Sequence, residues 1–112
     1  MSTSQIQYLA RINKLQSLQQ KVAYFEKTPD QYRKTLEIFK EYIEFIKTFS
    51  EPKSLINGLL RMAQYCEKMD DRLLSGDLYK DALNLMRTFK LGDSQHIQNL
   101  RSKIESLHYY SF

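Results

Sequence analysis

The sequence predicts an all-α protein of five antiparallel helices, arranged as two helical hairpins followed by a C-terminal helix. The chain of 112 residues holds only three glycines and two prolines, which favours helices joined by short connections. Valine occurs once, at Val22, and no stretch alternates apolar and polar residues with the period of a strand. Apolar residues recur instead at spacings of three and four. Because the connections are short, consecutive helices should pack antiparallel in a compact helical bundle.

Length and composition predict a single all-helical domain over residues 1–112. Apolar residues make up 42% and charged residues 27% of the chain, which is ordinary for a globular domain of this size. The net charge of +4 permits an acidic partner, a membrane surface or nucleic acid without requiring any of them. Residues 1–25 carry Arg11, Lys14 and Lys21 and no acid. A mitochondrial presequence is an alternative for this segment, although one arginine is few for it.

The cysteine count and the lengths of the apolar runs indicate the cellular compartment of the protein. Cys66 is the only cysteine, which excludes an intrachain disulfide and a thiolate metal site built from this chain alone. The sequence has no apolar run long enough to span a bilayer and no secretory signal pattern. We therefore expect a cytoplasmic protein without a transmembrane segment, in a reducing compartment.

The first helix should span about residues 4–26. Ser4 followed by Gln7 has the spacing of a capping box at its N-terminus. Spacings of three and four place the following apolar residues on one inner face, which Ile6 and Leu9 continue toward the N-terminus: Ile12, Leu15, Leu18, Val22 and Phe25. This face predicts a helix packed along one side.

The second helix should span about residues 29–49. Thr28 is a candidate N-cap, Pro29 suits the first helical position and Gln31 completes a second capping box. The helix has two apolar stripes: Leu36, Phe39, Ile43 and Ile46, and then Ile38, Tyr42, Phe45 and Phe49. Two stripes predict a helix buried on two sides. The alternative is that the second stripe forms a groove for a partner.

Helices three, four and five should span about residues 51–69, 71–90 and 94–109. Ser50 and Pro52 mark the first start, and Asp70 and Asp71 mark the second. Gly92 suits a left-handed stop, and Asp93 suits the next N-cap. The main inner face of helix three consists of Leu55, Leu59, Met62, Cys66 and Met69. On helix four it consists of Leu74, Leu78, Ala82, Leu85 and Phe89. On helix five it consists of Ile97, Leu100, Ile104 and Leu107. The tail aromatics Tyr109, Tyr110 and Phe112 should dock on the domain or on a partner.

The third and fourth helices carry small residues where two close-packed arms would cross. Ala63 lies on the first arm, and Ser75 and Ala82 flank Tyr79 on the second. With the acidic turn at Asp70-Asp71, residues 56–89 resemble one tetratricopeptide repeat, a 34-residue helical hairpin. The match departs from the family at Cys66, where an aromatic is frequent, and at Arg87, where a proline often closes the repeat. In the first hairpin Thr35, Phe39 and Tyr42 mirror Ser75, Tyr79 and Ala82 at an offset of 40 residues.

The sequence holds no catalytic, cofactor-binding or metal-binding constellation, so we predict that the protein is not an enzyme. His96 and His108 lie twelve residues apart, and no pair of histidines has the spacing of a zinc site. Cys66 belongs to an apolar stripe, which is typical of a small core residue. Asp77 and Asp81 have the spacing of neighbours on a solvated helix face.

Nucleic-acid binding through a basic surface is the alternative function. The chain has eight tyrosines, but they are spread along it, and from Glu26 to Asp81 the cations alternate with acids. Nucleic acid is therefore the weaker prediction. Binding of the first helix to a membrane surface is weaker still, because its apolar stripe is needed for the core.

The function predicted first is that of a protein–protein interaction module, such as a small adaptor, a chaperone-like subunit or a scaffold component. Its partner, another protein, would lay a peptide or helix against the first arms of the hairpins. The resemblance implies that the partner-binding residues lie on helix three, with Lys21 and Tyr24 added from helix one: Asn57, Leu60, Arg61, Gln64 and Lys68. Self-association into a homo-oligomer through the exposed edge at one end is a second use of such a surface.

Overall fold

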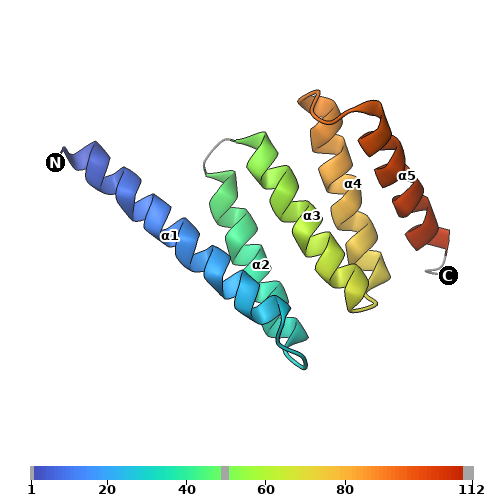
Figure 1. Cartoon of the computed structure of the whole chain (residues 1–112), viewed down its shortest axis with the longest axis horizontal. Helices are drawn as coiled ribbons and strands as arrows, with labels where there is room; N and C mark the ends of the chain where they lie inside the picture. Colours follow the sequence, from blue (N-terminus) through green and yellow to red (C-terminus); the bar gives the residue numbers. More distant parts are fainter. Residues whose placement is uncertain (1, 49–50, 110–112) are drawn as a thin grey trace. The chain divides into compact units, whose positions relative to one another are not determined.

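A computed structural model describes residues 2–48 and 51–109, and the fold in these ranges is all-α, as predicted. The described residues form five α-helices and no strand: α1 (Thr3–Glu26), α2 (Tyr32–Lys47), α3 (Pro52–Lys68), α4 (Arg72–Thr88) and α5 (Ser94–Tyr109) (Figure 1). Contacts divide the chain into two compact units, residues 1–49 and residues 50–112. The single domain over residues 1–112 stays a prediction.

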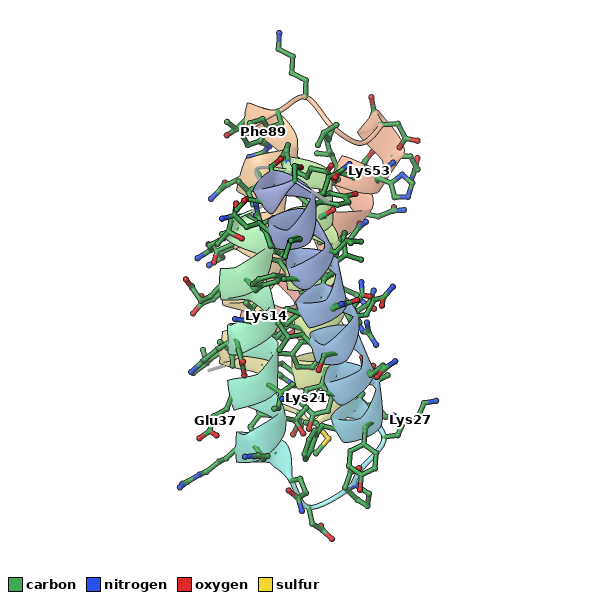
Figure 2. The ribbon with its side chains drawn as sticks, turned by 90° about the vertical axis from the view of Figure 1, so that its left-hand side faces the viewer. Lys14, Lys21, Lys27, Glu37, Lys53 and Phe89 are labelled. Atoms are coloured by element: carbon green, nitrogen blue, oxygen red, sulfur yellow. The ribbon has the colours of Figure 1, made fainter. Side chains whose placement is uncertain are left out.

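The first unit is a helical hairpin in which α1 and α2 pack together (Figure 1). The chain reverses at Asp30, whose φ of 68° lies in the left-handed region. The Thr35 hydroxyl donates to the carbonyls of Phe25 at 3.2 Å and Gln31 at 2.8 Å, which joins the start of α2 to the end of α1. The Lys14 ammonium of α1 lies 4.9 Å from the ring centroid of Phe45 of α2, which is a further contact between the two helices. In Figure 2, Lys14 and Lys21 follow one another along α1.

Both predicted N-caps of this unit were wrong. The N-cap of α1 is Ser2, whose hydroxyl accepts from the Gln5 amide, while the Gln5 side chain accepts from the Ser2 amide. The capping box therefore lies two residues before the predicted Ser4. Thr28 does not cap α2, because its hydroxyl donates to the Tyr24 carbonyl at 2.9 Å. The left-handed Asp30 interrupts any helix begun at residue 29, so α2 starts at Tyr32.

The second unit holds three helices, and α4 packs against both α3 and α5 (Figure 1). Pro52 occupies the first turn of α3 behind an N-cap at Glu51, whereas the predicted cap at Ser50 lies outside the described residues. Asp71 caps α4 through a hydrogen bond from the Leu74 amide, as expected. At the start of α5, Gly92 has the predicted positive φ, and Asp93 accepts from the His96 amide at 2.8 Å.

The buried positions of the two hairpins repeat at an offset of 40 residues. Each position buried within residues 2–48 has a buried counterpart 40 residues later: Leu18 and Gly58, Val22 and Met62, Thr35 and Ser75, Ile38 and Leu78, Phe39 and Tyr79, Tyr42 and Ala82, Ile43 and Leu83, and Ile46 and Met86. The hydroxyls of Ser75 and Thr35 both donate to a carbonyl of the preceding helix, Ala63 at 2.8 Å and Phe25 at 3.2 Å, although these two acceptors are 38 residues apart. The offset noticed in the sequence is thus an offset of packing. Residues from both predicted stripes of α2 are buried.

Most predicted core residues are buried or half-buried, but four of those that the structure describes are exposed. Met69 is 39% and Phe89 50% exposed, because each is the C-cap of its helix and lies past the last turn. Ile6 and Leu9 are exposed at the other extreme, near the start of α1. Phe49, Tyr110 and Phe112 lie outside the described residues, and so does the side chain of Tyr109. The docking predicted for the tail therefore stays a prediction.

Candidate functional site

The five partner-binding residues predicted on α3 lie together on its outer side. Asn57, Gln64 and Lys68 are exposed, and Leu60 and Arg61 are half-buried. Spacings of three and four along α3 place these side chains on one face. The opposite face is apolar and buried: Ile56, Leu59, Met62, Ala63 and Cys66. The five residues, defined here as the α3 outer face, therefore present one half-buried apolar side chain between polar and cationic groups.

The members of the α3 outer face are not equally available. Asn57, Gln64 and Lys68 project from a helix whose backbone is fixed by packing against α4. Arg61 is half-buried and has an interaction partner within the structure. Its guanidinium is therefore the least free group of the five. A ligand would meet the two amides, the ammonium of Lys68 and the side chain of Leu60 first.

Lys21 and Tyr24, the two residues predicted on helix one, are exposed on α1. Tyr24 is 66% exposed, and its ring meets that of Phe25 edge to face at 5.1 Å. An exposed tyrosine fixed by a neighbouring ring offers contact area at low entropic cost. Both residues belong to the unit of residues 1–49, and they form a separate candidate surface from the α3 outer face.

Sequence reasoning missed an exposed apolar surface at the start of α1. The Arg11 guanidinium donates to the carbonyl oxygen of Thr48 at 2.8 Å and to its hydroxyl at 3.1 Å, so the end of α2 lies beside Arg11. Residues 3–10 therefore extend past α2, as Figure 1 shows. Ile6 and Tyr8 are 55% and 62% exposed there. No signal in the sequence indicated this, because the helices predicted over residues 4–26 and 29–49 are nearly equal in length, whereas α1 has 24 residues and α2 has 16.

A second surface that sequence reasoning missed is a groove between α4 and α5. Its volume is about 300 Å³, and we call it the α4–α5 groove: Lys80, Leu83, Asn84, Arg87, Arg101, Ile104 and Glu105 line it. Leu83 and Ile104 are buried, whereas the polar lining residues are exposed. Lys80, Asn84 and Arg87 are spaced four and three apart, which was a visible signal of one cationic helix face. The pairing of that face with Arg101 comes only from the packing of α5.

Glu67, Tyr79 and Lys103 form a polar cluster that joins all three helices of the second unit. The Tyr79 phenol donates to Oε1 of Glu67 at 2.8 Å, and the Lys103 ammonium donates to the same oxygen at 3.1 Å. The ammonium also lies 5.5 Å from the centroid of the Tyr79 ring. Burial, together with the hydrogen bond to Glu67 and its charge, raises the pKa of the Tyr79 phenol far above its ordinary value. The phenol therefore stays protonated at neutral pH, and the cluster acts as a structural clamp.

Asp93 and His96 lie together at the start of α5. His96 is exposed, and its Nδ1 lies 3.2 Å from Oδ1 of Asp93. The hydrogen bond from the His96 backbone holds the pKa of Asp93 below its usual range. No group of three or more His, Cys, Asp or Glu residues within the described ranges is placed to hold a metal ion. The side chain of His108 is not among those described.

Comparison with known proteins found no matching family model, no matching curated protein and no matching solved structure. Over residues 2–48 and 51–109, no helix is both long enough and apolar enough to cross a bilayer.

Proposed function

We propose that the protein is a protein–protein interaction module, an adaptor, chaperone-like or scaffold subunit, that binds a partner peptide or helix on the α3 outer face. The observation that carries this proposal is the two-sided character of α3. One side is buried, while the other presents Asn57, Gln64 and Lys68 around the half-buried Leu60. Interfaces commonly combine an apolar contact with surrounding polar groups.

The chemistry of this face suits a peptide. The side-chain amides of Asn57 and Gln64 can each donate to and accept from a peptide backbone. Lys68 can pair with a carboxylate of the partner, and Leu60 supplies the apolar contact. Because packing against α4 already fixes α3, binding would cost little ordering of the backbone on this side.

The resemblance to a tetratricopeptide repeat supports the same surface. Ala63, Ser75 and Ala82 are fully buried, and the hydroxyl of Ser75 bonds the Ala63 carbonyl, which fits two closely packed arms. The first arms would then be α1, α3 and α5, and the first-arm face of such repeats is the one that grips peptides. Lys21 and Tyr24 of α1 belong to the other unit and stay a separate candidate surface. The packing offset of 40 residues is longer than the 34 residues of that family.

The test begins with affinity purification of partners on the full chain, followed by mass spectrometry. The binding of the recovered partner is then measured with a Gln64→Glu/Lys68→Glu variant, in which both altered side chains are exposed. A second variant, Arg61→Glu, probes the half-buried member of the same face. Lys40→Glu, on the exposed side of α2, is the matched control for the change in charge.

We expect the double variant to weaken partner binding about tenfold or more, with a thermal unfolding curve like that of the control. Equal binding by the double variant and the control would contradict the proposal. Retention of the wild-type chain on heparin that falls steeply with salt, in the absence of any protein partner, would favour nucleic-acid binding instead.

A further inference from the structure

We infer that the α4–α5 groove is a second binding site and that it takes an acidic peptide segment of a protein partner. The inference rests on the proposed function for one point, that the partner is a protein. It does not depend on the proposed surface, since no residue of the α3 outer face lines the groove. The lining residues come from two helices that pack directly against one another within one unit. The groove is therefore part of a defined pair of helices.

The charge of the groove is unbalanced. Among the described residues that line it, Lys80, Arg87 and Arg101 are cationic, and Glu105 is the only acid. Within the described residues, none of the three cations has a hydrogen bond or an ion pair, whereas Lys47, Arg72 and Lys103 each have a carboxylate partner. Three cations without partners around one depression attract an anionic ligand and repel a cationic one.

The apolar floor of the groove distinguishes it from an ordinary solvated basic helix face. Leu83 and Ile104 are buried and close its bottom. A ligand that filled the groove would thus meet apolar side chains below and cations at the rim. A volume of about 300 Å³ is near the lower limit of ligand sites. It suits a few side chains of an extended or helical segment.

The spacing of the cations sets the pattern of acids in that segment. Lys80 and Arg87 are seven residues apart on α4, a rise of about 10 Å along the helix axis. In a peptide with the polyproline II conformation, which has three residues per turn, acids three residues apart lie on the same side and cover about the same distance. Asn84 lies between the two cations and is exposed, so its amide can bond the peptide backbone. The arginines at positions 87 and 101 suit planar carboxylates, which they can bind with two hydrogen bonds each.

Nucleic acid fits the groove less well than a peptide does. Glu105 lies in the groove itself, and Asp77 and Asp81 are exposed on the same helix, α4. A continuous phosphate backbone would pass close to these carboxylates, whereas a peptide can place its few acids against the cations alone. The apolar floor also offers contacts to aliphatic side chains.

The experiment measures the binding of a labelled peptide by fluorescence anisotropy with the full chain. The probe is a peptide of about twelve residues with an Asp-Leu-Ser repeat, which places an acid at every third position. A peptide with Asn in place of Asp is the control for charge, and a single-stranded oligonucleotide of equal length tests nucleic acid. The variants are Arg87→Glu/Arg101→Glu, the milder Arg87→Gln/Arg101→Gln in case the first fails to fold, and Lys40→Glu as the matched control outside the groove.

We expect the wild-type chain to bind the acidic peptide about tenfold or more tightly than its Asn counterpart. Both arginine double variants should lose this preference, and Lys40→Glu should keep it within about twofold. The inference is overturned if the arginine variants bind like the wild type, or if the oligonucleotide binds more tightly than the peptide at physiological salt. Loss of the purified partner by Gln64→Glu/Lys68→Glu, with no effect of the arginine variants on partner or probe, would support the α3 outer face and overturn the groove.

Discussion

The phenol of Tyr79 donates a 2.8 Å hydrogen bond to Oε1 of Glu67, which joins the middle of α4 to the end of α3. The same oxygen accepts from Lys103 of α5 at 3.1 Å. Tyr79 is almost fully buried, while Glu67 is partly exposed. The Glu67 carboxylate thus connects three consecutive helices, which carry the α3 outer face and the α4–α5 groove.

Removing the hydroxyl alone should cost less than removing the ring. Tyr79→Phe loses one hydrogen bond and should lower the free energy of unfolding by about 1 kcal/mol, because Lys103 still pairs with Glu67. Tyr79→Ala leaves a cavity in the core and should cost about 3–5 kcal/mol. Urea unfolding followed by circular dichroism measures both values. Equal losses in the two variants would show that the hydrogen bond, and not the packed ring, is the main contribution.

The same phenol predicts a dependence of stability on pH. Its pKa is raised in the folded protein, so the folded state holds this proton more tightly than the unfolded state does. The resulting stabilisation is complete below the ordinary tyrosine pKa of about 10 and declines as the pH rises above it. The difference in unfolding free energy between wild type and Tyr79→Phe should therefore shrink above about pH 10. A difference that stays constant through that range would contradict the assignment.

The close approach of α3 and α4 predicts that enlarging Ala63 is costly. Ala63 is fully buried, and its carbonyl accepts from the Ser75 hydroxyl, so Ala63→Leu must separate the helices. We expect a loss of about 1–3 kcal/mol. Ala23 is the matched control, because it occupies the position 40 residues earlier and is only half-buried. Ala23→Leu should cost less, and a larger loss there would contradict the greater burial of Ala63.

The part of α1 that extends past α2 should contribute little to stability. Leu9 and Leu18 lie on the same helix, but Leu9 is 44% exposed and Leu18 only 2%. Leu18→Ala should lower the free energy of unfolding by about 2–5 kcal/mol, and Leu9→Ala by less than about 1 kcal/mol. Chemical denaturation measures the pair. A large loss with Leu9→Ala would show that residues 3–10 are covered in solution.

Periodicity predicted the number of helices and most of the core, because burial of an apolar stripe is a local property of the sequence. The ends of helices were harder to place. Ser2 with Gln5 and Ser4 with Gln7 have the same spacing, and only the structure shows that the first pair forms the capping box. Thr28 and Pro29 resemble a helix start, but the left-handed Asp30 moves that start to Tyr32.

The candidate surfaces show the same division between local and long-range information. The α3 outer face follows from spacing along one helix, and the structure places its five residues on one side of α3. The α4–α5 groove needs Arg87 and Arg101 brought together by packing, and helical periodicity does not specify which faces of two helices meet. Arg87 was noticed in the sequence only as a residue that replaces a proline.

The most direct test of the α3 outer face is site-specific photo-crosslinking with the purified partner. A photoreactive side chain replaces Gln64 in one variant and Lys40, which is also exposed but lies on α2, in another. We predict a covalent adduct with the partner at position 64, lost when an excess of unlabelled wild-type chain competes, and none at position 40. Binding of the partner without an adduct at position 64 would contradict the central claim that the α3 outer face is its site.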